Sequence, residues 1–292
     1  MHFIRMEEIT ATKATGPNAF PTGAIIKEAW QICTTFFWPL TLAILLIQIP
    51  EKILVSIAAE NQSWKVSFLY EAFISGFVFV GVYRTIYRLK SHGIPPTLSD
   101  IYAEGQPFYG RNFRLVFSSN LLGLIVILGL GLMIFPCFML LRDSNKGPWS
   151  YVPLTTSIII GSLILTWLAA RFFIYRAALA DDASGATFAI EEAFRLTKGK
   201  ALKVLPLLLC MLGFLMVFAG LHVVTYFLIA GGFENEISKG TEIKINMISA
   251  LPFAFMEALG ISMAALAYLH LRDESRSAAA AASSAAPEAP PS

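Results

Sequence analysis

Four ionisable side chains interrupt long apolar stretches of this sequence and could carry out chemistry inside a membrane: Glu257, Glu71, His222 and Arg171. An ionisable group is costly in hydrocarbon, so its presence there predicts a proton relay or a substrate path. Glu257 is the strongest candidate because it lies near the middle of an apolar segment, whereas Glu71 and His222 lie nearer the ends of theirs. For each of them the alternative is a buried polar contact that only holds helices together. Arg171 could pair with a carboxylate or extend its charge to the membrane surface.

Other catalytic patterns are missing from the sequence. The four histidines and three cysteines are scattered over different segments, without the spacing of metal ligands or of a disulfide framework. No serine nucleophile elbow, HExxH pair or phosphate-binding glycine loop is present. We therefore expect no catalytic residue, no metal and no cofactor, and predict that the protein is not an enzyme.

The composition indicates that a lipid bilayer surrounds most of the chain. Of its 292 residues, 56% are hydrophobic and 14% are charged, and the mean hydropathy is +0.63. Soluble domains carry about 25% charged residues. The net charge of +2 is too small to suggest binding to nucleic acid. The sequence therefore predicts an integral membrane protein whose main partner is lipid.

Six apolar runs are each long enough to cross a bilayer as a helix of about 20 residues. The first predicted span has its continuous apolar part at 39–49, with Pro50 near its end, and extends back to 36 and on toward 57; residues 51–65 are expected to form a short external connector. The other predicted spans are 66–89, 115–141, 151–170, 202–230 and 245–271. Short amphipathic helices are predicted at 22–31, from 97 onward and at 184–198. The expected fold is all-α, a polytopic membrane protein with six transmembrane helices and short interfacial helices on the cytoplasmic side. We divide the chain into a polar N-terminal segment (1–21), a six-helix membrane domain (22–273) and a disordered Ala/Pro-rich tail (274–292).

Some polar and small residues within the spans predict contacts between helices. Gln48 and Asn120 are expected to form hydrogen bonds from one helix to another, and Gly123, Gly129 and Gly131 are expected to let a neighbouring backbone come close.

The distribution of basic residues predicts the orientation of the spans. With the N-terminus inside, 16 of the 22 Lys and Arg residues fall on inner segments and 6 on outer ones. The positive-inside rule then places both termini in the cytoplasm and the protein in the cell (inner) membrane. Basic loops at this surface could contact anionic lipid.

Three of the inner segments share a short pattern of an acid, a small or aliphatic residue and an aromatic residue. They are Glu28-Ala-Trp30, Asp100-Ile-Tyr102 and Glu192-Ala-Phe194. The pattern predicts a unit of one interfacial helix followed by a membrane hairpin, repeated three times. The alternative is that any interfacial helix has this composition.

The polar stretch between the fourth and fifth spans resembles the characteristic loop of an uncharacterised family of bacterial multi-pass membrane proteins. The resemblance rests on Arg171, Ala183-Ser184, Ala189 and the run that holds Ala193, Phe194, Thr197 and Gly199. This family is similar to the membrane domain attached to some glycerophosphoryl diester phosphodiesterases, and the resemblance implies a six-helix membrane fold. Phosphodiesterase activity is not expected, because no connector is long enough to hold the required metal-binding barrel.

Two functions are consistent with the sequence. The first is a non-enzymatic membrane-organising or accessory role, with amphipathic helices on the inner leaflet. The second is a small secondary transporter or channel that uses Glu257 in a polar path. The two differ in whether Glu257 faces a cavity or only packs against a partner side chain. The sequence identifies neither a substrate nor a protein partner.

Overall fold

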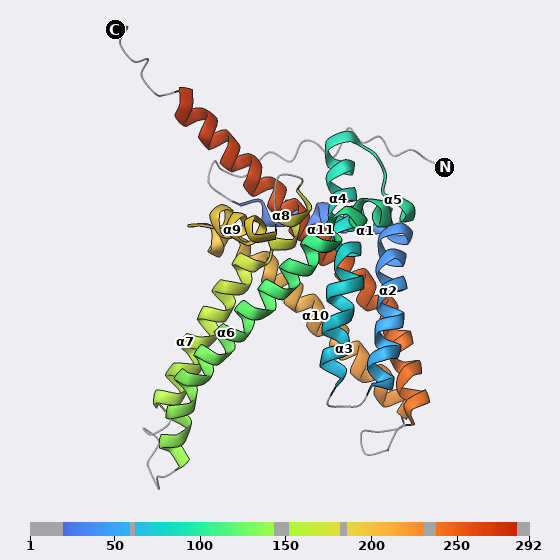
Figure 1. Ribbon diagram of the computed structural model, residues 1–292, viewed down its shortest axis with the longest axis vertical. Coiled ribbons are helices and arrows are strands. Elements are labelled where there is room, and N and C mark those ends of the chain that lie inside the picture. Colours follow the sequence, from blue (N-terminus) through green and yellow to red (C-terminus); the bar gives the residue numbers. More distant parts are fainter. Residues whose placement is uncertain (1–19, 59–61, 143–151, 182–185, 231–237, 285–292) are drawn as a thin grey trace.

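The computed structural model describes residues 20–58, 62–142, 152–181, 186–230 and 238–284. Every regular element in these ranges is a helix, and six helical rods are long and apolar enough to cross a membrane (Figure 1). The predicted all-α fold with six apolar spans is confirmed, and it indicates a multi-pass membrane protein. The rods are α2 (Phe37–Ile57); α3 (Ser63–Tyr70), η2 (Glu71–Ser75) and α4 (Gly76–His92) in continuous succession; α6 (Tyr109–Arg142); α7 (Val152–Phe172); α10 (Ala201–Ala230); and α11 (Lys239–Ser284).

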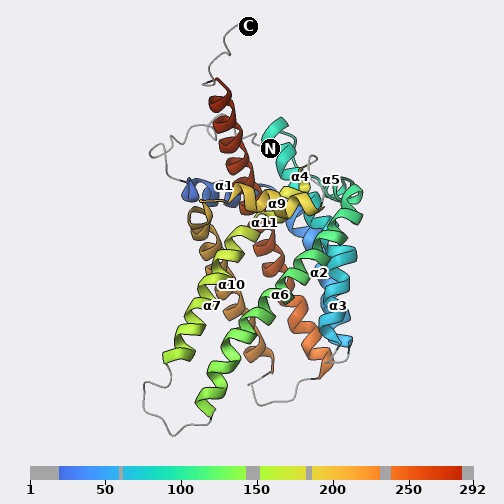
Figure 2. The ribbon, with the colours of Figure 1, turned by 60° about the vertical axis from the view of Figure 1, so that its left-hand side comes forward.

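Short helices lie across the long ones at one end of the bundle (Figure 2). They are α1 (Thr22–Thr35), α5 (Leu98–Gly105), which continues into the 3-10 turn η3 (Gln106–Phe108), and α9 (Ala186–Leu196), with α8 (Tyr175–Ala180) just before it. Each of α1, α5 and α9 precedes a hairpin of long helices, as the threefold repeat predicts. Each also packs on the helix that ends another hairpin: α1 on α11, α5 on α4 and α9 on α7 and α8.

Matching positions of the three short helices are buried. Ala29, Ile101 and Ala193, the central residues of the repeated pattern, are all fully buried. Small or compact side chains at these positions let each short helix lie close to its partner. The three segments therefore occupy equivalent places in the fold.

Helix α11 forms the centre of the bundle. It contacts α1, α2, α4 and α10, and its segment from Ala258 to Tyr268 is buried throughout. Ala254, Ala258, Ala264 and Ala267 are among the buried residues, and such small side chains allow close packing of helices in a membrane, where apolar side chains gain little by leaving lipid. This packing fixes the position of every side chain that α11 carries, including Glu257.

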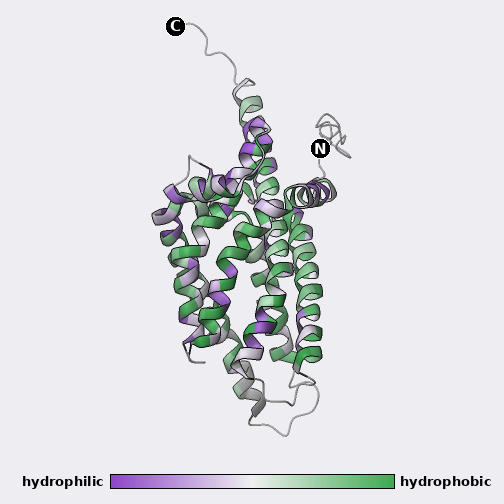
Figure 3. Cartoon of the chain, turned by 90° about the vertical axis from the view of Figure 1, so that its right-hand side faces the viewer, coloured by the Kyte–Doolittle hydropathy of each residue, from purple (hydrophilic) through white to green (hydrophobic). Residues whose placement is uncertain are grey.

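The remaining helices are peripheral and apolar. Helices α6 and α7 lean away from α2 and α3 (Figure 1), and most residues of α6, α7 and α10 are exposed. Figure 3 shows hydrophobic residues along the long helices, with hydrophilic residues gathered toward the end that carries the C-terminal part of α11. Exposed apolar side chains in this amount match a hydrocarbon surrounding.

Two helices come into close backbone contact at glycines that the pattern of small residues in the sequence does not predict. A Cβ at Gly81 would lie 1.9 Å from the carbonyl oxygen of Ile101, and a Cβ at Gly105 would lie 2.1 Å from that of Phe77. These two glycines bring α4 and α5 into backbone contact. A Cβ at position 123, 129 or 131 would meet no other atom within 4 Å among the described residues, so the predicted close contacts there are wrong.

Two helix ends differ from the sequence prediction. Helix α2 runs through Pro50 to Ile57, so Glu51 and Lys52 belong to the span and not to an external connector. Helix α11 continues to Ser284, whereas the sequence predicted a disordered tail from residue 274. Alanine has the highest helix propensity, and a run of alanines after Arg276 extends the helix. Residues 285–292 of that tail, and residues 1–19 of the polar N-terminal segment, lie outside the described residues.

Candidate functional site

A cavity of about 600 Å³ lies among α2, α3, η2 and α11 and reaches α8. Its charged lining consists of Glu51, Lys52, Glu71, Arg176 and Glu257. Five charged groups around one space between apolar helices are costly to keep there, because each loses hydration that only pairing or a ligand can replace. The cavity is therefore the strongest candidate for a functional site in the described part of the chain.

Glu257 faces this cavity and also contacts a neighbouring helix. The Nε2 of Gln48, on α2, donates a hydrogen bond to the Oε2 of Glu257, on α11. The interhelical hydrogen bond predicted for Gln48 is thus confirmed. Asn120 instead donates to the carbonyl oxygen of Val116 in its own helix at 2.8 Å, so the same prediction for Asn120 is wrong. Both features that distinguish the two functions, a partner side chain and a cavity, are present at Glu257.

An ion pair between α8 and η2 lines the cavity. Arg176, from α8, donates to the Oε1 of Glu71, and its Cζ lies 5.5 Å from the centre of the Phe79 ring. Glu71 begins the π-helical turn η2, which inserts an extra residue into the helix between α3 and α4. Such turns are frequent at functional sites because they change the direction of side chains along a helix. The first and last residues of η2, Glu71 and Ser75, both line the cavity.

The other end of the cavity lies near the start of α3, at the end of the bundle opposite α1, α5 and α9 (Figure 1). Glu51 accepts a 2.6 Å hydrogen bond from Ser67. Lys52 extends its Nζ over the ring of Phe253 at 4.8 Å, and no carboxylate of the described residues lies within ion-pair distance of it. Trp64, which is 66% exposed, lines the same region and could interact with a ligand that enters.

Two of the predicted residues lie outside the cavity. His222, on α10, has its ring 6.1 Å from the ring of Phe253, a residue that Lys52 contacts as well. Arg171 lies with its Cζ 4.2 Å from the Trp167 ring and 5.1 Å from the Phe194 ring, and no described carboxylate pairs with it. Arg171 therefore has the role of an aromatic-stacked residue at the end of α7.

The residues of the family-like loop have structural positions at the end of α9. Ala193 and Thr197 are fully buried, and the Thr197 hydroxyl donates to the Ala193 carbonyl oxygen at 2.6 Å. The Phe194 ring packs edge-on against Phe172. Gly199 has a φ of 71°, a left-handed conformation that glycine adopts without strain after a helix end. None of the four lines the cavity.

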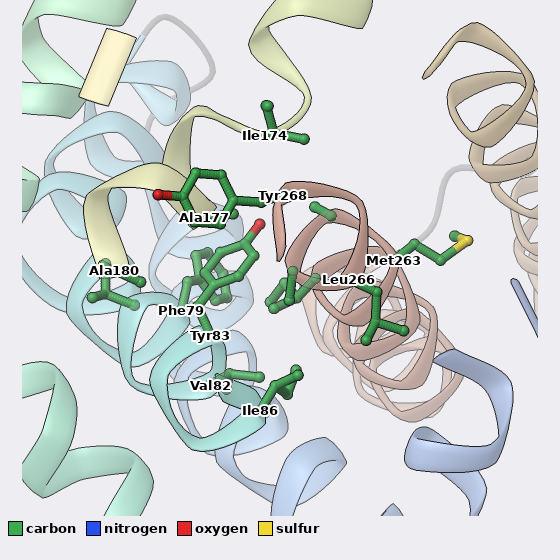
Figure 4. Close-up of a cluster of buried hydrophobic side chains, with 14 of the residues drawn as sticks. Phe79, Val82, Tyr83, Ile86, Ile174, Ala177, Ala180, Met263, Leu266 and Tyr268 are labelled. Carbon is green, nitrogen blue, oxygen red and sulfur yellow. The ribbon is translucent and has the colours of Figure 1, made fainter. Parts of the chain in front are cut away.

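A layer of buried aromatic side chains separates the cavity from the opposite end of the bundle. Figure 4 shows Phe79, Tyr83, Ala177 and Tyr268 among a cluster of buried side chains that α4, α8 and α11 contribute. Tyr87 donates to the Ala177 carbonyl oxygen at 2.7 Å, so this hydroxyl is satisfied within the layer. Of these labelled residues, only Phe79 also lines the cavity.

Beyond this layer lies a second, smaller pocket of about 220 Å³ that includes Asp181, Arg195 and Arg272. Asp181 accepts hydrogen bonds of 2.8 Å from both Tyr268 and Arg272. Burial raises the pKa of the Asp181 carboxyl, but these hydrogen bonds outweigh the burial and bring the pKa below its ordinary value. The acid is thus held in its charged form at neutral pH and fixes α8 to α11.

Three charged residues of the cavity were not selected from the sequence. Glu51 and Lys52 follow Pro50, which the sequence predicts to lie near the end of the first span. The apolar residues Ile53 to Val55, directly after them, are the feature of the sequence that indicates a longer helix. The sequence predicts Arg176 to be one of the 16 basic residues of the inner segments. Arg176 pairs with Glu71, which lies 105 residues earlier in the chain, and the periodicity of a sequence does not encode such a tertiary contact.

Among the described residues, no group of three or more histidine, cysteine, aspartate or glutamate side chains could hold a metal ion. The cavity therefore offers carboxylates, an amine, a guanidinium and an amide for binding a solute or a proton. No known protein family, curated protein or solved structure matches this chain.

Proposed function

We propose that this protein is a non-enzymatic membrane protein that admits a small polar solute into the cavity around Glu257 and moves it across the bilayer as a secondary transporter. The cavity itself carries this proposal. Glu257 lies between apolar helices, yet one face of it is open to a space of about 600 Å³ with four other charged groups. A side chain that only held two helices together would not require such a space.

The orientation of the proposed transporter follows from the basic residues. The positive-inside rule puts α1, α5 and α9 at the cytoplasmic surface of the cell membrane, with both termini on that side. The cavity then opens toward the external side, and the Arg176–Glu71 pair with the aromatic layer closes it on the cytoplasmic side. Transport requires a second conformation in which the cavity is closed toward the external side and open toward the cytoplasm.

Labelling of cysteine from each side of the membrane tests this proposal. Ser75 lines the cavity, and its buried hydroxyl has no hydrogen-bond partner in the described structure. In a chain without native cysteines, Ser75→Cys is expected to react with an impermeant cationic methanethiosulfonate reagent from outside and, more slowly, from inside. Trp64→Cys should react only from outside and Arg276→Cys only from inside. Reaction of Ser75→Cys from one side alone, or from neither, would contradict transport.

Replacing Glu257 tests its part in the path. Glu257→Gln should fold normally, because an amide oxygen can still accept the hydrogen bond from Gln48. We expect it to abolish a proton-linked flux, measured with an interior pH dye in proteoliposomes after a potassium diffusion potential is imposed. Glu191→Gln, on the exposed face of α9 and outside the cavity, is the matched control and should keep the flux of the unchanged protein. Equal flux in Glu257→Gln and the unchanged protein would remove Glu257 from the path.

The second candidate function is an organising role at the inner leaflet. The observation that favours it is the common position of α1, α5 and α9 at one end of the bundle (Figure 2). On the proposed cytoplasmic surface, basic residues of these segments would contact anionic lipid, each contributing about 1 kcal/mol. Retention of a defined lipid or a protein partner in mild detergent, together with one-sided labelling of Ser75→Cys, would favour this role over transport.

A further inference from the structure

We propose that the cavity binds the ammonium group of a small organic amine between Glu257 and Glu51, and that this group exchanges with a proton. The inference rests on the proposed function and specifies its substrate class. A primary ammonium group could belong to a free amine or to the headgroup of an ethanolamine lipid. The two sources share the same recognition chemistry.

The charge balance of the cavity is the first argument. Three carboxylates and two cations line it, and Arg176 and Glu71 neutralise each other. Glu51, Glu257 and Lys52 remain, which leaves an excess of one negative charge when all are ionised. An unbalanced charge between apolar helices is costly, so either a proton or a bound cation must compensate it. One excess charge matches a monocation better than a dication.

The free hydrogen-bond acceptors of the cavity are the second argument. Gln48 occupies only the Oε2 of Glu257, and Ser67 occupies only the Oε1 of Glu51. The Oε1 of Gln48 is buried without a hydrogen-bond partner in the described structure, and it too belongs to the cavity lining. An ammonium group has three donors and no acceptor. An ammonium group therefore complements this set of oxygen atoms, whereas the same oxygen atoms would repel an anion.

The size and the aromatic lining of the cavity indicate an organic cation. A space of about 600 Å³ falls in the range of small-molecule sites and is far larger than a bare ion needs. Trp64 and Phe79 line it together with Val55. Aromatic rings attract cations across their faces and also bury a short hydrocarbon body.

Proton exchange follows from the surroundings of Glu257. The charged and titratable groups that interact electrostatically with it are Glu51 and Lys52 from α2, Glu71 from η2, Tyr83 from α4 and Arg176 from α8. When an ammonium group binds, the Glu257 carboxyl releases its proton and the carboxylate takes the cation in its place. One positive charge enters the site and one leaves, so the step is balanced.

Calorimetry with three ligands of matched size tests the inference. Butylammonium, butyrate and 1-butanol are titrated into the full-length protein in phosphatidylglycerol nanodiscs, in two buffers of different ionisation enthalpy. Butylammonium is expected to bind at least about tenfold more tightly than the other two, a difference of about 1.4 kcal/mol. Its binding should release about one proton and should weaken as the pH falls, because protons compete for Glu257. Glu257→Gln should lose the proton release and about tenfold in affinity, while Glu191→Gln, outside the cavity, should match the unchanged protein.

The outcomes separate this inference from the proposed function. Tighter binding of butyrate or butanol, or butylammonium binding without proton release, would overturn the ammonium exchange but leave a solute cavity in place. Failure of all three ligands to bind would overturn the inference, and unreactive Ser75→Cys would overturn the transporter itself. Nanodiscs that contain phosphatidylethanolamine distinguish the sources: a weaker apparent affinity for butylammonium indicates the lipid headgroup, and an unchanged affinity indicates a free amine.

Discussion

Arg176→Gln is expected to lower the free energy of unfolding by about 1–3 kcal/mol, between the costs for exposed and for fully buried ion pairs, because the side chains of Arg176 and Glu71 remain 20% and 36% exposed. The substitution leaves the Glu71 carboxylate beside the cavity without its guanidinium. It also removes the contact of Arg176 with the Phe79 ring and loosens α8 from α4. Reversible unfolding in mixed micelles, followed by the helical signal in circular dichroism, measures the change.

A second substitution distinguishes the ion pair from simple loss of packing. Adding Glu71→Gln to Arg176→Gln removes the unbalanced charge and is expected to restore most of the lost stability, because two amides can share a hydrogen bond. Arg195→Gln is the matched control, since Arg195 pairs with Glu192 but is 58% exposed. Its effect should stay below about 1 kcal/mol. A double variant as unstable as Arg176→Gln would show that the charge balance is not what Arg176 supplies.

Gly81→Ala is expected to destabilise the protein by about 3 kcal/mol, at the upper end of the usual cost of overpacking. The new methyl group would lie 1.9 Å from the Ile101 carbonyl oxygen, and a backbone atom cannot rotate away as a side chain can. Helices α4 and α5 must therefore separate. Because Gly105→Ala forces the same separation, the double variant should cost less than the sum of the two single ones.

The control for this contact is Gly123→Ala on α6. A Cβ there meets no atom of another described segment within 4 Å, so only the higher helix propensity of alanine acts, and stability should rise by up to about 1 kcal/mol. The same unfolding measurement serves all four variants. Equal effects of Gly81→Ala and Gly123→Ala would contradict the backbone contact between α4 and α5.

The spans could be predicted because a bilayer requires long apolar helices, and nothing else in the chain produces such runs. The interruptions of those runs also identified Glu257 and Glu71, since a carboxylate in an apolar segment stands out by composition alone. The limits of the helices were harder to predict. Pro50 suggested an end of the first span, but neighbouring helices stabilise a proline within a membrane helix, and α2 continues to Ile57.

The pairing of charges could not be predicted from local patterns. Arg176 looked like an ordinary cytoplasmic residue because its partner, Glu71, lies in a different hairpin. The glycines of α6 looked like a packing surface, yet the close contact occurs at Gly81 and Gly105, whose surrounding sequence is no richer in small residues. Which surface of a helix meets which neighbour depends on the arrangement of all six spans, and a single helix does not contain that information.

The contact between α1 and α11 has a consequence for biosynthesis. The Sγ of Cys33 lies 3.3 Å from the Oγ of Ser262, and the two residues are separated by 229 positions in the chain. At a synthesis rate of about 5–20 residues per second, roughly 10–45 seconds pass between the synthesis of α1 and that of the part of α11 that it contacts. During that interval the nascent chain exposes Ile25, Ala29 and Ile32 to lipid or to an insertion factor. Among the described helices, α1 is thus the first to be synthesised and one of the last to complete its contacts.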